Sequence, residues 1–149
     1  MTTNANLYEQ DFFQWTQATA ALIRAGKWHQ IDPESVAEEL ESLGKEDRRE
    51  LEDRIEALIV ELLKWWAQPE ERCGRWASAI IQQRDEVELI LRDSPSLEAD
   101  LPAWLVEAYP IAREKALEET RLYTLPEACP FTPAQILDMN FWPEGATLP

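Results

Sequence analysis

The sequence predicts an all-α protein, a mainly antiparallel bundle of about five or six helices. Apolar residues recur at spacings of three and four, which is the period of an amphipathic helix. No stretch alternates with a period of two, and no Asn-Gly or Asp-Gly pair marks a hairpin turn. The chain has 149 residues, enough for one domain with a sizeable core. We therefore expect a single domain over residues 1–149, with residues 126–149 as an ordered tail packed on the bundle.

The first two helices are predicted from their end signals and apolar faces. Asn6 is a candidate N-cap for a helix that ends at Gly26, with one face formed by Phe12, Trp15, Thr19 and Leu22. A second helix begins at Pro33, because Asp32 is a good N-cap and proline fits the first helical position. Its apolar stripe is Val36, Leu40 and Leu43, and Gly44 either ends the helix or bends it into the next.

The third predicted helix, residues 45–67, has the clearest pattern and should be central. Its apolar side chains step by four, three and four along Leu51, Ile55, Leu58 and Leu62. A fourth helix is expected over residues 71–92, with Arg84 in its apolar stripe and Cys73 as a buried small side chain. A fifth starts at Ser94-Pro95, is kinked or broken at Pro110 and continues to about Tyr123.

The C-terminal segment changes composition, because eight of the ten prolines lie at or after Pro95. Thr132-Pro133-Ala134-Gln135 has the pattern of a capping box and predicts one short helix there. Phe131, Phe141 and Trp142 give this segment apolar side chains to bury. We therefore expect a proline-rich tail that is ordered on the bundle, with loose last residues.

The charge balance excludes several classes of function. The chain has 29 acidic and 14 basic residues, a net charge of −15. A surface this acidic repels nucleic-acid phosphates and anionic lipids. No apolar run reaches the roughly 20 residues of a membrane span, and the N-terminus has no signal-peptide pattern. We expect a cytoplasmic protein with reduced cysteines that binds neither nucleic acid nor membrane.

Seven fragments together resemble a known family. They are residues 8–16, 36–44, 48–51, 62–65, 68–70, 83–84 and 129–132, in order along nearly the whole chain. They are similar to the bacterial domain-of-unknown-function family numbered 29. The resemblance implies an all-helical fold and no assigned activity. It also implies a histidine just before the Leu-Leu-Lys-Trp segment, where this chain has Glu61, so a role that needs that histidine is in doubt here.

A charged cluster between helices is the first candidate site. Glu34, Glu38 and Glu41 share one helical face, which is either a solvated acidic face or a ladder of cation ligands. Arg84 lies in an apolar stripe, and a buried guanidinium requires carboxylate or carbonyl partners. We expect Arg84, Arg48 or both to pair with Glu38, Glu39 or Glu41. Such a cluster either fixes helix register or reads a small anion.

An aromatic and arginine patch is the second candidate site. Trp65, Arg72 and Trp76, with Arg75 and Pro69 nearby, combine residue types that are favoured as interface anchors. The alternative is an arginine side chain that only covers a tryptophan. The candidate binding residues are therefore Glu38, Glu41, Arg48, Arg84, Trp65, Arg72 and Trp76, with no catalytic residue, metal ligand or cofactor predicted.

Two functions remain open from the sequence. One histidine, His29, and no nucleophile in a catalytic context favour a non-enzymatic acidic interaction or adaptor domain. Its partner would be an unknown protein, for which the acidity favours a basic surface, or a second copy of the chain. The alternative is a small-anion or divalent-cation binding protein, with or without enzymatic activity, that uses a Glu/Arg cluster between helices.

Overall fold

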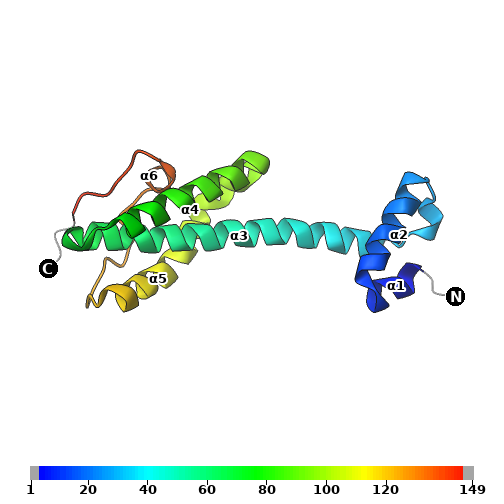
Figure 1. Ribbon diagram of the computed structural model, residues 1–149, viewed down its shortest axis with the longest axis horizontal. Coiled ribbons are helices and arrows are strands. Elements are labelled where there is room, and N and C mark those ends of the chain that lie inside the picture. Colours follow the sequence, from blue (N-terminus) through cyan, green and yellow to red (C-terminus); the bar gives the residue numbers. More distant parts are fainter. Residues whose placement is uncertain (1–3, 146–149) are drawn as a thin grey trace. The chain divides into compact units, whose positions relative to one another are not determined.

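The computed structural model describes residues 4–145, and these form six α-helices and no strand (Figure 1). The helices are α1 (Asn4–Gln10), α2 (Phe12–Arg24), α3 (Pro33–Ala67), α4 (Gly74–Asp93), α5 (Leu101–Thr120) and α6 (Pro133–Leu137). The all-α prediction is confirmed. The chain divides into two compact units, unit 1 (Met1–Glu46) and unit 2 (Asp47–Pro149). The expectation of a single domain stays a prediction.

Unit 1 begins with two helices where the sequence predicts one. Asp11 leaves the helical conformation, and its carboxylate accepts a hydrogen bond from the backbone N–H of Gln14 at 3.0 Å. Aspartate is a strong N-cap because its side chain satisfies an N–H that has no partner within the helix. The expected continuous helix over residues 7–26 was therefore wrong, and Asp11 is the signal that the prediction overlooked.

An aromatic cluster holds the two helices of unit 1 together. Tyr8, Phe12 and Trp15 lie with ring centroids 4.8–6.0 Å apart. The Tyr8 hydroxyl donates to Glu39 at 2.5 Å and to Glu38 at 3.3 Å. Hydrogen bonding to Glu39, with the negative charge of both carboxylates, holds the pKa of Tyr8 well above its ordinary value. These contacts join α1 to the first turns of α3.

Helix α3 runs without interruption through Gly44. The start is as predicted, since the Asp32 carboxylate accepts from the Ser35 hydroxyl at 2.8 Å and from the Glu34 N–H at 3.2 Å. The two helices predicted on either side of Gly44 are one helix. A glycine costs a helix only about 1 kcal/mol, and good helix formers on both sides outweigh that cost.

The predicted apolar stripe at the start of α3 is mostly not buried. Val36 is half-buried, but Leu40 is 64% exposed and Leu43 is 60% exposed. The apolar stripe is therefore present in the sequence, but its two leucines are not buried. Their spacing has the helical period, but the other described helices of unit 1 do not cover them.

Unit 2 contains the hydrophobic core. The predicted stripe of Leu51, Ile55, Leu58 and Leu62 is fully buried, so the second half of α3 is its centre. It packs with α4 and α5, as the ion pair and hydrogen bond between these helices also show (Figure 1). The other core residues are Ile59, Val60, Leu63, Ile80, Val87, Leu101, Trp104, Leu105, Tyr109, Ala112, Ala116, Leu125, Phe131 and Ile136.

One local prediction for unit 2 needs correction, and one of the two alternatives left open at Pro110 is ruled out. Cys73 is exposed at the N-cap position of α4, rather than buried on a helix face. The fifth helix does not break at Pro110, which lies inside α5. Pro110 is exposed, so the missing backbone hydrogen bond lies on the side of the helix that water reaches. The helix begins at Leu101 because residues 95–100 form a 3₁₀ turn.

The tail of unit 2 contains the short predicted helix. Thr132 and Gln135 make both hydrogen bonds of a capping box at the start of α6. Phe131 and Ile136 are buried in the core. Residues 146–149, expected to be loose, lie outside the described part of the chain.

Candidate functional site

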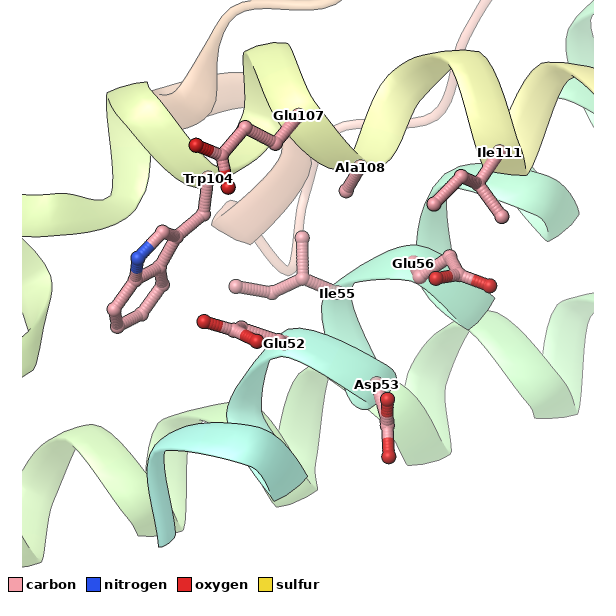
Figure 2. Close-up of a pocket in the computed structure, with 8 residues that line it drawn as sticks. All are labelled: Glu52, Asp53, Ile55, Glu56, Trp104, Glu107, Ala108 and Ile111. Carbon is pink, nitrogen blue, oxygen red and sulfur yellow. The ribbon is translucent and has the colours of Figure 1, made fainter. Parts of the chain in front are cut away.

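A groove between α3 and α5 in unit 2 is lined by many charged side chains. Two adjoining cavities, of about 150 and 440 Å³, share Asp53 and Glu56 in their walls. Figure 2 shows Ile55 and Ala108 between the two helices, with Trp104 and Glu52 at one end. Ile111 and Glu56 lie at the other end of this view. The groove thus has an apolar floor and an acidic rim.

The rim has more negative than positive groups. Six carboxylates line the two cavities: Glu52, Asp53, Glu56, Glu61, Glu107 and Glu119. Three cations neutralise part of this charge: Arg48 pairs with Glu52 at 3.3 Å, Lys115 with Glu56, and Lys64 with Glu61 and Glu119. Asp53 and Glu107 have no ion pair among residues 4–145. The set therefore keeps a negative balance that an incoming cation would meet.

Lys64 is a buried ion paired with two carboxylates of the groove, Glu61 and Glu119. Its Nζ lies 3.1 Å from Glu61, 3.0 Å from Glu119 and 5.0 Å from the centroid of the Trp76 ring. Burial acts to lower the pKa of Lys64, but the hydrogen bonds from Glu119 and Glu61 outweigh it and raise the pKa above its ordinary value. One oxygen of Glu61, Oε2, is buried and has no hydrogen-bond partner among the described residues.

Arg48 is the predicted site residue that lies at this groove. Its guanidinium carbon is 5.0 Å from the centroid of the Trp104 ring, and its Nε donates to Glu52 at 3.3 Å. A cation over an indole face is worth about 0.5–1 kcal/mol at an exposed site. The predicted partners Glu38, Glu39 and Glu41 were wrong for Arg48, because its carboxylate partner is Glu52, one turn further along α3.

Arg84 is buried, but its partners are not the predicted carboxylates. It is 2% exposed and donates to the carbonyls of Ile136 at 2.8 Å, Phe141 at 2.8 Å and Gln135 at 3.1 Å. Its guanidinium carbon also lies 5.8 Å from the Trp142 ring centroid. Desolvation lowers the pKa of Arg84, although guanidinium stays charged in proteins. Arg84 thus holds the tail, with each of its three nitrogens donating to one backbone carbonyl.

The predicted tryptophan and arginine patch separates into two places. Arg72 covers Trp65 at 4.9 Å and donates to the carbonyls of Trp65 and Pro143 at 2.8 and 3.0 Å. The Trp65 and Trp142 centroids are 4.9 Å apart, so this part also fixes the tail. Trp76 instead packs against Lys64. Arg72 therefore has the geometry of the alternative interpretation, an arginine side chain that covers a tryptophan.

The remaining predicted residues, Glu38 and Glu41, belong to unit 1. Glu38 accepts from Tyr8, and Glu41 is exposed without an ion pair among the described residues. The binding role of every predicted residue stays a prediction. What the structure changes is their grouping, because Arg48 is at the groove and Arg84, Arg72 and Trp65 are at the tail.

Sequence reasoning missed most of the groove. A usable signal was present, since Glu107, Ile111, Lys115 and Glu119 follow one another at a spacing of four on α5. On α3, Glu52 and Glu56 lie one turn apart beside the core stripe. Such stripes resemble ordinary solvated faces until a partner helix is known to lie beside them.

The described residues contain neither a metal-ligand cluster nor a membrane-spanning helix. Between residues 4 and 145, no three His, Cys, Asp or Glu side chains converge in a way that could hold a metal ion. In the same range, no helix combines the length and apolar character needed to cross a membrane.

The sequence matches the model of one protein family. An all-helical chain whose core is centred on one long helix matches the family described as "Domain of unknown function DUF29" over residues 7–142. The chain belongs to this family, as the fragments quoted above indicate. No curated protein and no solved structure matches it significantly. The family description assigns no activity, so any function has to be argued from the residues.

Proposed function

We propose that the protein is a non-enzymatic interaction domain whose α3/α5 groove docks a basic, amphipathic segment of a partner protein. The observation that carries this proposal is the acidic rim over an apolar floor, with Asp53 and Glu107 free of ion pairs among the described residues. An amphipathic helix in a groove uses apolar anchors for affinity and charge for orientation. We place this role in the cytoplasm, which suits the free thiols Cys73 and Cys129.

The alternative of a small-anion or divalent-cation site has less support. An anion site would require accessible donors, and Arg84 is 2% exposed and already donates to three carbonyls of the tail. A cation site would require converging ligands, which residues 4–145 do not offer. We therefore propose a protein partner, rather than a small ligand, as the occupant of the groove.

The test uses a probe with the proposed chemistry. A fluorescent peptide of three Lys-Leu-Leu-Lys repeats should bind the full chain, and its Gln-Leu-Leu-Gln counterpart should bind far less. Fluorescence anisotropy at low salt and at about 0.15 M salt measures both affinities. The variant D53K/E107K should weaken binding of the basic peptide about tenfold, because it reverses two rim charges.

The matched control carries the same charge change away from the groove. Asp85 and Asp93 are exposed on α4 and take part in no described ion pair, so D85K/D93K alters the net charge equally. It should change the affinity less than twofold, roughly the effect of screened long-range attraction. If both double variants weaken binding equally, the peptide is held by overall charge and the groove proposal fails.

A further inference from the structure

A second cavity of unit 2 lies between α5 and the tail. Its volume is about 620 Å³, with residues 102–110 of α5 on one side and residues 127–133 on the other. None of its described lining residues lines the α3/α5 groove. Cavities that bind small organic molecules measure about 300–1,000 Å³ and are mostly apolar. The volume therefore suits a small molecule, at a place that the docking proposal does not use.

Hydrogen bonds and packing hold the tail side of this cavity in place. The Tyr109 hydroxyl donates to the carbonyl of Pro126 at 2.5 Å, and Arg113 Nε donates to the carbonyl of Leu125 at 3.0 Å. These bonds fix the start of the lining segment. At its other end, Phe131 is buried in the core. The cavity is therefore formed before a ligand arrives, and binding has to order little of the chain.

The inner part of the cavity is apolar and offers few hydrogen-bond donors. Leu105, Tyr109 and Phe131 are buried in its wall, and the Tyr109 hydroxyl proton is already engaged with the tail. The thiol of Cys129 is half-buried, and burial raises its pKa, so it is uncharged at neutral pH. Proline has no backbone N–H, and three prolines line the cavity: Pro102, Pro110 and Pro133. Such walls suit a hydrocarbon or aromatic body.

The rim of the cavity is negatively charged. Val106 and Glu127 are exposed lining residues, and Glu127 is the one charged side chain among the described residues that line the cavity. Glu127 makes no ion pair within residues 4–145. A cation there would meet a free carboxylate in a protein of net charge −15, whereas an anion would be repelled. At the rim a charge also keeps its contact with water, so it avoids the cost of burial.

We infer that this cavity binds a small apolar amine, with its hydrocarbon or aromatic body between α5 and the tail and its ammonium group beside Glu127. The apolar walls supply affinity, because the ligand body leaves water. The carboxylate supplies selection by the sign of the ligand charge. The inference is independent of the proposed docking of a partner, since the two sites share no described lining residue.

The test uses Cys129 as a reporter inside the cavity wall. In C73S it is the single cysteine of the chain, and iodoacetamide alkylation followed by intact mass spectrometry measures its reaction rate. Phenylbutylamine and phenylbutyrate are the probes, because they share one apolar body and differ in the sign of their charge. At about 1 mM the amine should slow alkylation about threefold, the protection expected for a Kd near 0.5 mM. Phenylbutyrate should leave the rate nearly unchanged.

Two controls are built into the chain. C129S keeps Cys73, which is exposed at the start of α4 and outside the cavity lining, so phenylbutylamine should not slow its alkylation. In the C73S background, E127Q should remove most of the protection by the amine. E114Q removes the same charge from an exposed position of α5 outside the lining, and it should retain the protection.

Several outcomes would overturn the inference. Alkylation of Cys129 that the amine does not slow would do so, and so would equal slowing at Cys73, which would indicate an effect of the probe on the reagent. Equal protection by phenylbutyrate, or loss of protection in E114Q as large as in E127Q, would contradict the assignment to Glu127. Peptide mapping of the alkylated wild-type chain compares the two cysteines within one protein, so the result does not depend on how C129S folds.

Discussion

Unit 1 and unit 2 are both helical but are stabilised in different ways. Unit 2 buries 18 apolar residues around the second half of α3, and its described residues form six ion pairs. Unit 1 buries Trp15 with Thr19 and Ser35 among its described residues, and exposes most of its large apolar side chains. Both units follow the same helical periodicity. The difference teaches that the apolar period identifies the apolar face of a helix. Whether that face is buried depends on whether another surface covers it.

The largest contrast should appear when a leucine is truncated in each unit. Leu58→Ala should lower the free energy of unfolding by about 2–5 kcal/mol, because Leu58 is fully buried. Leu43→Ala should cost less than about 0.5 kcal/mol in dilute solution, since the side chain is exposed and alanine keeps the helix. Urea denaturation followed by circular dichroism measures both. Equal losses would contradict the contrast between the units.

Removing the buried arginine should have the next largest effect. Arg84→Met should destabilise unit 2 by about 3 kcal/mol, because three carbonyls of the tail lose a charged donor. Amide exchange should rise first in residues 135–142. Arg92→Met is the control, because Arg92 is 66% exposed and its ion pair with Glu88 lies at the surface. A tail that stays protected in Arg84→Met would show that the apolar contacts hold it without the guanidinium.

A smaller effect is expected within unit 1. Trp15→Ala should speed amide exchange throughout α2, since Trp15 packs against Tyr8 and Phe12. The loss is limited to roughly 1–2 kcal/mol, because a unit with few buried side chains has little local stability to lose. Phe13→Ala should leave exchange nearly unchanged, as Phe13 is 73% exposed. Similar exchange in the two variants would mean that Trp15 is not the anchor of this unit.

The smallest effect concerns alkaline pH. Burial raises the pKa of Tyr109 from 10.0 to about 12. A folded-state pKa above the unfolded one means that the native state keeps its proton longer, so this stability is complete below about pH 10 and is lost as the pH rises towards 12. Tyr109→Phe removes a hydrogen bond to the Pro126 carbonyl at 2.5 Å and should cost about 1 kcal/mol at neutral pH.

The same variant should weaken the pH dependence. The fall in melting temperature between pH 10 and 12 should be shallower in Tyr109→Phe than in wild type. The raised pKa of Lys64 leaves some alkaline dependence in both proteins. Tyr123→Phe should behave like wild type, because Tyr123 is fully exposed. An unchanged slope in Tyr109→Phe would assign the alkaline loss to other groups.

Local signals made much of the fold predictable. The stripe of Leu51, Ile55, Leu58 and Leu62, the Asp32 cap and the Thr132 capping box are interactions between neighbours in sequence, and all three are present. Arg84 could be recognised as buried, because a charge within an apolar stripe needs partners. The identity of those partners could not, since they are backbone carbonyls more than 50 residues away, and every residue type has a carbonyl.

The candidate site was less predictable for a related reason. Its rim is made of glutamates and aspartates that are common all along an acidic chain. Only the pairing of α3 with α5 distinguishes Glu107 and Asp53 from carboxylates such as Glu41 or Asp85. Leu40 and Leu43 show the opposite difference between pattern and structure. Their spacing is that of a buried face, but no described part of unit 1 covers them.

The hydrogen bonds of Arg84 also set an order of events during synthesis. The ribosome makes the three carbonyl partners 51, 52 and 57 residues after it makes Arg84. Until those residues emerge, the guanidinium has no carbonyl partners and its burial is strongly unfavourable. Helices α3 and α4 can form earlier, since their backbone bonds are local. We therefore expect that face of α4 to stay in water in the nascent chain until the tail can supply these carbonyls.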